Sequence, residues 1–188
     1  MKIVIEGKKA YIYTPYNSEF VMKIKRLDSA EWDSNKQAWK VNADRIPAAR
    51  KIMCSVYGES DIRESKRYDV QLTFREEFQE EYDGIYIFGK CLAYAYSHRG
   101  EARVGDDVCF LEGGCTSGGS RNRRTTIIEK GSVVIVGDVP ETMVQREERV
   151  DGVDYEFFER TPDKSALLEE KNSLLNRIAV IDSLLSCD

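Results

Sequence analysis

The chain has 188 residues, of which 41% are hydrophobic and 32% are charged. This composition is sufficient for a packed core and excludes a disordered chain. No apolar run approaches the length of a membrane span, and the first residues lack the apolar stretch of a signal peptide, so we expect a cytoplasmic protein. The net charge is −5 at pH 7. It is unevenly distributed, because residues 1–58 are basic and residues 59–160 are acidic, and a basic end of this kind favours a polyanionic partner.

Residues 1–58 are predicted to form a small domain with the element order ββαββα. The β-rich runs 2–6 and 10–14 flank a Gly-Lys-Lys turn, which predicts a hairpin. A second hairpin is predicted around the polar turn at residues 33–36. Each hairpin is followed by a segment in which apolar residues recur three and four positions apart, the spacing of one face of a helix.

The ends of these two helices are predicted from capping residues. Ser18 is the expected N-cap of a helix that continues to about Leu27, because its hydroxyl can accept a hydrogen bond from a free backbone N–H. Asp44 is the expected N-cap of the second helix. Gly58 is expected to end that helix, since glycine readily adopts the left-handed conformation found at helix C-termini.

The remaining chain is predicted to contain a linker, a mainly β domain and a C-terminal helix. Residues 59–67 are polar and form the linker, and residues 68–160 contain short apolar runs joined by glycine turns, with one helix expected over Lys90–Tyr96. Thr161-Pro162 begins a long amphipathic helix through residue 188. This helix is expected to pack on its own domain, form a homodimeric coiled coil or bind a partner. The predicted fold class is therefore α+β.

Residues 10–21, with the turn Thr-Pro-Tyr-Asn, and the hairpin that carries Trp32 and Trp39 resemble the HARP domain. In that family the domain lies beside annealing-helicase motors and recognises branched or forked DNA. The resemblance covers just under a third of the chain and implies nucleic-acid binding. The phosphate-binding motif GxxxxGK[ST] is absent from the sequence, so the resemblance does not extend to a motor.

Aromatic and cationic side chains in this region are the candidate nucleic-acid contacts. Aromatic rings can stack on unpaired bases, and Lys or Arg can neutralise phosphates. The two tryptophans are either core residues or stacking residues. The candidates are Tyr13, Tyr16, Lys23, Lys25, Arg26, Trp32, Lys36, Trp39 and Lys40.

A second cationic segment lies in the acidic region. Residues 116–124 place Arg121, Arg123 and Arg124 after a glycine-containing run that we expect to be a flexible loop. The guanidinium fork matches phosphate geometry, which favours a contact to nucleic acid or a phosphorylated protein. The alternative is a surface loop whose arginines pair with the acidic surroundings.

Enzymatic chemistry is less strongly indicated. His98 is the single histidine, and with Glu101 it could cleave RNA by acid–base catalysis. We expect binding rather than catalysis, with no cofactor and no metal site, because the cysteines and carboxylates lack metal-ligand spacing. The five cysteines are an odd number at irregular spacings and are expected to be reduced thiols.

The segment Gly-Ile-Tyr-Ile-Phe-Gly-Lys at residues 84–90, the Ser/Gly run and the leucine-rich C-terminus resemble small proteins of phages and conjugative elements of Gram-positive bacteria. Some of these resemble anti-CRISPR inhibitors of type II Cas nucleases, including ones that act on the guide RNA. The resemblance implies a nucleic-acid-binding accessory protein in the host bacterial cytoplasm that acts on a guide RNA or its ribonucleoprotein. The alternatives are a fork or single-strand DNA-binding protein and a small ribonuclease.

Overall fold

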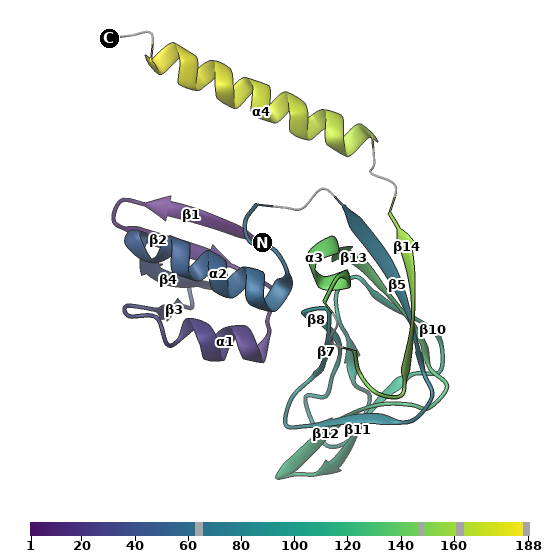
Figure 1. Cartoon of the computed structure of the whole chain (residues 1–188). Helices are drawn as coiled ribbons and strands as arrows, with labels where there is room; N and C mark the ends of the chain where they lie inside the picture. Colours follow the sequence, from purple (N-terminus) through teal and green to yellow (C-terminus); the bar gives the residue numbers. More distant parts are fainter. Residues whose placement is uncertain (63–65, 147–148, 161–163, 186–188) are drawn as a thin grey trace.

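The computed structural model describes residues 1–62, 66–146, 149–160 and 164–185. Among the described residues, more lie in strands than in helices, and the strands form four antiparallel sheets. The chain is thus mostly β, and the predicted α+β class is wrong. Two units can be distinguished, an N-terminal unit (residues 1–58) and a β unit (residues 67–160), with α4 lying apart from both (Figure 1).

The N-terminal unit is one sheet covered on one face by two helices. Both predicted hairpins are confirmed, because β1 pairs with β2 and β3 pairs with β4, and the strand order is β1-β2-β4-β3. Its elements are β1 (Lys2–Glu6), β2 (Lys9–Tyr13), α1 (Ser18–Ile24), β3 (Glu31–Asp33), β4 (Ala38–Asn42), the short 3-10 helix η1 (Ala43–Arg45) and α2 (Ile46–Tyr57). Ile12 and Val41 from the sheet pack against Phe20 of α1 and Met53 of α2 in a buried core.

Both predicted N-caps are wrong. The Oδ1 atom of Asn17 accepts a hydrogen bond from the Phe20 amide at 3.0 Å, so Asn17, one residue before Ser18, caps α1. Asp44 lies inside η1, and α2 begins after it without a side-chain cap. Gly58 ends α2 as predicted, with a φ of 80°.

The β unit consists of three small sheets around a second core. Their strand orders are β10-β13-β5-β14, β11-β12-β6 and β7-β8-β9. The elements are β5 (Arg67–Phe74), β6 (Phe78–Glu81), β7 (Ile85–Ile87), β8 (Lys90–Tyr94), β9 (Arg103–Val104), β10 (Val108–Glu112), β11 (Cys115–Ser120), β12 (Arg123–Ile128), β13 (Val133–Pro140), α3 (Glu141–Val144) and β14 (Val153–Glu159). The helix predicted over Lys90–Tyr96 is wrong. Residues 90–94 form β8 instead, whose backbone pairs with β7 and β9 and whose Leu92 and Ala93 are fully buried.

Helix α4 (Lys164–Leu185) adds none of its described side chains to either core. Its apolar side chains at Leu168, Leu174, Leu175, Ile178 and Ile181 are exposed by 41–58%. The predicted Thr161-Pro162 cap lies outside the described residues. Among the helices of the described chain, none is both long and apolar enough to cross a membrane.

The two units meet at the C-terminal end of α2. The Thr142 hydroxyl donates a hydrogen bond to the Gly58 carbonyl at 2.7 Å, and the Arg146 guanidinium donates to the carbonyls of Cys54 and Ser55 at 2.8 Å. At Gly89, which has a φ of 72°, an added Cβ would lie 2.3 Å from the Val56 carbonyl oxygen. The backbones are therefore in direct contact, and a larger residue at Gly89 would push them apart.

Candidate nucleic-acid interface

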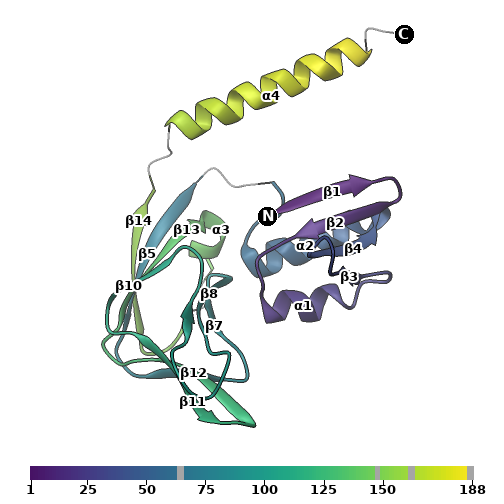
Figure 2. The same cartoon turned by 180° about the vertical axis from the view of Figure 1, so that it is seen from behind.

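The sheet of the N-terminal unit leaves one face uncovered by any described helix (Figure 2). Successive side chains of a strand point to opposite faces. On β2, Ala10 and Ile12 are fully buried beneath the helices. Tyr11 and Tyr13 therefore project from the open face, side by side along the second strand of the sheet.

Lysines surround these two rings. The Nζ atom of Lys36 lies 3.7 Å from the Tyr11 ring centroid, and that of Lys2 lies 4.6 Å from the Tyr13 centroid. Lys40 of β4 is the register partner of Tyr11. We call this surface the tyrosine–lysine face, and it consists of Lys2, Lys9, Tyr11, Tyr13, Lys36 and Lys40.

The lysines of this face also have polar partners. Lys36 pairs with Glu6 at 2.5 Å and Lys40 pairs with Glu31 at 2.7 Å, and both glutamates are exposed. The hydrogen bond to each glutamate raises the pKa of Lys36 and of Lys40, so both are cationic at neutral pH. Because exposed ion pairs contribute little net stability, exchanging a glutamate for a phosphate costs little.

The tyrosine–lysine face brings together only some of the predicted residues. Tyr13, Lys36 and Lys40 were predicted, whereas Tyr11, Lys2 and Lys9 were not. The alternation of Lys-Ala-Tyr-Ile-Tyr on β2 is the signal that finds Tyr11, because it places Tyr11 and Tyr13 on the same side of the strand.

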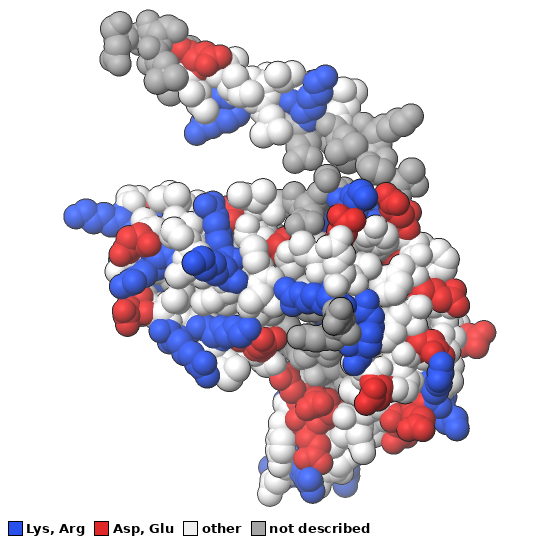
Figure 3. Space-filling model, in the orientation of Figure 1, with Lys and Arg blue, Asp and Glu red and all other residues white. Residues whose placement is uncertain are grey.

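Three predicted cations lie on the opposite side of the N-terminal unit. Lys23 on α1 pairs with Glu19 at 2.6 Å and donates to the Ser55 hydroxyl on α2 at 2.9 Å. Lys25 and Arg26 follow α1 and are exposed, with no side-chain partner among the described residues. In Figure 3, Lys and Arg side chains gather over this helical side. The predicted cations therefore occupy two separate surfaces.

The two tryptophans differ in burial. Trp39 is 6% exposed and belongs to the core, whereas Trp32 at the sheet edge is 50% exposed. Their ring centroids are 5.5 Å apart in an edge-to-face contact. Trp39 is thus a core residue, and of the two only Trp32 presents a ring to solvent.

The predicted flexible loop at residues 116–124 is wrong. These residues form the hairpin β11–β12, because the β-branched residues that follow pair with β11 on one side and β6 on the other. Arg123 pairs with Glu81 at 2.7 Å, and Arg124 donates to the Tyr82 carbonyl at 2.5 Å and to the Tyr94 hydroxyl at 2.9 Å. Arg121 lies at the exposed hairpin turn.

Tyr16 and Arg124, predicted from distant segments, meet through Tyr94. The Tyr16 and Tyr94 rings are 6.4 Å apart, and the Arg124 guanidinium carbon lies 5.0 Å from the Tyr94 centroid. Tyr16 and Tyr94 line a cleft of about 740 Å³ between the N-terminal unit and the β unit, which we call the junction cleft.

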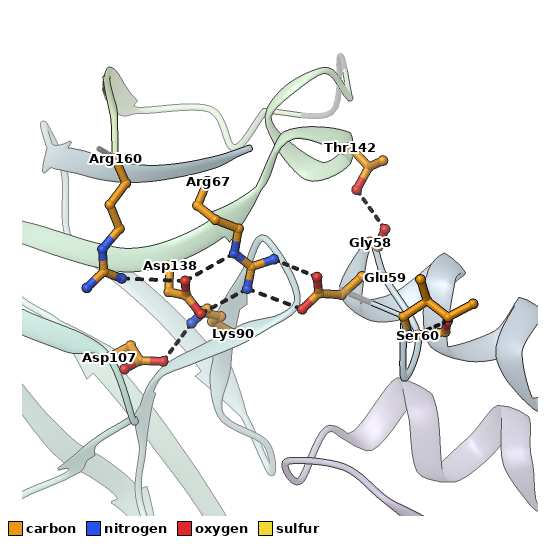
Figure 4. Close-up of polar contacts among 10 residues, drawn as sticks. Gly58, Glu59, Ser60, Arg67, Lys90, Asp107, Asp138, Thr142 and Arg160 are labelled. Atoms are coloured by element: carbon orange, nitrogen blue, oxygen red, sulfur yellow. Dashed lines mark hydrogen bonds and ion pairs between the residues drawn. The ribbon is translucent and has the colours of Figure 1, made fainter. Parts of the chain in front are cut away.

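A charge network borders the junction cleft (Figure 4). Arg67 at the start of β5 donates two hydrogen bonds to Glu59 and two to Asp138, and all three side chains are less than 20% exposed. Burial alone would lower the pKa of Arg67, but these hydrogen bonds outweigh burial and raise it. Glu59 immediately follows Gly58, so Arg67 ties the end of the N-terminal unit to the β unit.

The structure does not assemble the predicted acid–base pair. His98 is half-buried in an irregular segment, and Glu101 forms an isolated backbone bridge with Thr116. Among the described residues, no hydrogen bond or ion pair joins the His98 and Glu101 side chains. The described residues also contain no cluster of three or more His, Cys, Asp or Glu side chains positioned to hold a metal ion. Cys54, Cys91, Cys109 and Cys115 are free thiols, while Cys187 lies outside the described residues.

Comparison with known proteins gives no match: no family model, no curated protein and no solved structure is similar to this chain.

Proposed function

We propose that the protein binds unpaired nucleic acid through the tyrosine–lysine face. The observation that carries this proposal is the pair Tyr11 and Tyr13, which lie two residues apart on an uncovered sheet face with lysine ammonium groups against both rings. Four-stranded sheets that bind RNA use aromatic side chains on an open face to stack two or three bases. The same physical arrangement supports base stacking here.

Binding exchanges intramolecular contacts for contacts to the strand. Unpaired bases stack on the tyrosine rings, while Lys36 and Lys40 leave Glu6 and Glu31 to contact phosphates. For single strands, the logarithm of the affinity falls by about 0.7 per neutralised phosphate for each tenfold rise in salt. The four lysines of the face therefore limit this slope to about 3.

The resemblance to proteins of mobile elements supports a specific target for this face. We propose a guide RNA, alone or in the ribonucleoprotein of a type II Cas nuclease, within the cytoplasm of a bacterial host. Forked or single-stranded DNA is the alternative target. Both targets contain the unpaired bases that the tyrosine–lysine face requires.

The test measures binding of labelled guide RNA, single-stranded DNA, forked DNA and blunt duplex, each with and without the nuclease. Tyr11→Ala with Tyr13→Ala is expected to weaken binding of the single strand roughly 30-fold or more, because each stacked base contributes about 1–3 kcal/mol. Blunt duplex binding is expected to change little. If forked DNA binds equally well with and without the nuclease, the DNA target is assigned. If the protein shortens the guide RNA and the His98→Ala variant does not, the protein is a ribonuclease.

A matched pair of variants separates the two cationic surfaces of the N-terminal unit. Lys36→Gln with Lys40→Gln removes two charges from the tyrosine–lysine face, and Lys23→Gln with Arg26→Gln removes two from the helical side. We expect the first pair to weaken binding and reduce its salt dependence, and the second to have the smaller effect. If tyrosine and lysine variants of the face bind as tightly as the unaltered chain, with tryptophan fluorescence showing a folded unit, the proposal is refuted.

A further inference from the structure

The junction cleft presents aromatic rings from both units. Tyr16 is 63% exposed and Tyr96 is 65% exposed, although both line the cleft. Half-buried Tyr94 lies between them, with ring centroids 6.4 Å from Tyr16 and 4.7 Å from Tyr96. The exposed rings leave stacking surface open at a site large enough for a small ligand, since such sites commonly enclose roughly 300–1,000 Å³.

A cation without a carboxylate partner lies at the same end of the cleft. Arg103 on β9 is exposed, lies 5.1 Å from the Tyr96 centroid and makes no ion pair within the described chain. The other two cationic side chains that line the cleft are neutralised, because Lys90 pairs with Asp107 at 2.8 Å and Arg67 is engaged by two carboxylates. Arg103 is therefore the cationic side chain of the cleft best able to contact an anion.

Asp107, one of the acidic residues that line the cleft, is displaced from Arg103. Arg103 is the register partner of Tyr94 at the end of β8, whereas Lys90, which holds Asp107, begins that strand. At about 3.3 Å per residue, the two ends of β8 are roughly 13 Å apart. An anionic group at Arg103 thus avoids most of the repulsion from Asp107.

Buried polar atoms without partners lie beside the same rings. Within the described residues, the Tyr86 hydroxyl and the Arg124 Nε atom are the two buried side-chain polar atoms without a hydrogen-bond partner. Tyr86 lines the cleft, and Arg124 stacks on Tyr94, which lines it as well. Burial raises the pKa of Tyr86, so its hydroxyl remains a donor. Leaving a buried donor unsatisfied is costly, so these atoms favour a ligand that accepts hydrogen bonds from them.

We propose that the junction cleft is a second site that binds a nucleotide. Its base stacks on Tyr16 or Tyr96, and its phosphate contacts Arg103. The base edge, which carries hydrogen-bond acceptors, completes the hydrogen bonding of the donors beside the rings. This site is separate from the tyrosine–lysine face, and it takes either a free nucleotide or one nucleotide of a bound strand.

The experiment distinguishes these two sources of nucleotide. Equilibrium dialysis measures binding of AMP, GMP, CMP and UMP, and of the corresponding nucleosides, to the full chain and to the Tyr11→Ala/Tyr13→Ala variant. The cleft site is supported if the Tyr11→Ala/Tyr13→Ala variant still binds a mononucleotide and binds the corresponding nucleoside more weakly. This outcome does not depend on whether the tyrosine–lysine face binds nucleic acid. If mononucleotides do not bind, alkylation is repeated in the presence of an oligonucleotide. A slower alkylation of Cys91, which lines the cleft, with no change at exposed Cys109, supports binding of a nucleotide within a strand.

Substitutions of exposed cleft residues complete the test, because these side chains lie outside the hydrophobic cores. Tyr96→Ala is expected to weaken binding roughly fivefold or more, the loss of one stacked base, and Arg103→Gln is expected to remove the preference for nucleotide over nucleoside. The matched controls are Phe158→Ala, which removes a half-exposed ring of β14, and Arg121→Gln at the β11–β12 turn. Tyr86→Phe should weaken binding without destabilising the empty protein, since it deletes an unsatisfied donor. The proposal is overturned if neither mononucleotides nor oligonucleotides bind in a way that Tyr96→Ala or Arg103→Gln alters.

Discussion

Replacing Arg67 by alanine is expected to destabilise the protein strongly. The Arg67 guanidinium makes two hydrogen bonds to Asp138, at 3.0 and 2.9 Å, and two to Glu59, at 2.5 and 3.2 Å. The side chains of Arg67 and Glu59 are each 11% exposed, and that of Asp138 is 19% exposed. Alanine would leave two poorly hydrated carboxylates without their guanidinium.

The size of the effect follows from this burial. Removing one partner of a buried ion pair costs about 3–5 kcal/mol, because the remaining charge is left without compensation. Arg160 still lies 3.4 Å from the Asp138 carboxylate and offsets part of the loss. We therefore expect a decrease of about 3 kcal/mol in the free energy of unfolding.

Urea unfolding followed by tryptophan fluorescence and by circular dichroism measures this decrease. Both tryptophans of the chain lie in the N-terminal unit, so fluorescence reports that unit while circular dichroism reports the whole chain. The control is Arg160→Ala, which breaks the ion pairs of a half-exposed arginine with Asp69 and Asp138 and should cost less than about 1 kcal/mol. Equal, small losses for Arg67→Ala and Arg160→Ala would refute the assignment of Arg67 as the buried tie between the two units.

Three further measurements follow from burial and exposure. Alkylation at mildly alkaline pH should modify exposed Cys109 before Cys91. The alkylation rate of Cys91 should rise towards pH 11, because burial raises the pKa of that thiol to about 11 and only the thiolate reacts. Equal rates at the two cysteines would contradict the burial of Cys91. Deleting residues 161–188 should change the free energy of unfolding by less than about 1 kcal/mol, since the described side chains of α4 are in neither core. If the exposed apolar side chains of α4 pair with a second copy, the same deletion should convert a dimer to a monomer, which light scattering measures. An unchanged mass would exclude that pairing. Trp39→Ala should lower the free energy of unfolding by about 3–5 kcal/mol and Trp32→Ala by much less, because only Trp39 is buried. Similar losses of stability for the two variants in thermal unfolding would argue against this packing.

Local sequence was sufficient to place several elements of the N-terminal unit. Both hairpins were predicted from alternating β-rich runs and polar turns, and the end of α2 was predicted from Gly58. These features depend on residues a few positions apart, so the sequence near each one specifies it. The N-caps were predicted wrongly because Ser18 and Asp44 carry side-chain oxygens that could accept the capping hydrogen bond. Only the backbone geometry shows that Asn17 makes this bond at α1 and that η1 precedes α2.

Strand pairing determined what the propensities of single segments left open. The glycine run at residues 116–120 has weak strand propensity by itself, yet it forms β11 because β12 supplies a complete set of backbone partners. Lys90–Tyr94 became a strand for the same reason, between β7 and β9. In both cases the pairing with neighbouring strands, rather than the propensity of the segment itself, decided the secondary structure.

The charge of the N-terminal unit and the residue types of the candidate site were already present in the sequence. The sequence alone determined that the residues before Gly58 carry a net positive charge, because composition does not depend on folding. Only the tertiary structure decided which of them share a surface. Pairing of β2 with β4 sets Tyr11 beside Lys40, and packing of the two units sets Tyr16 beside Tyr94, because such neighbours are created by contacts between segments that the sequence keeps apart.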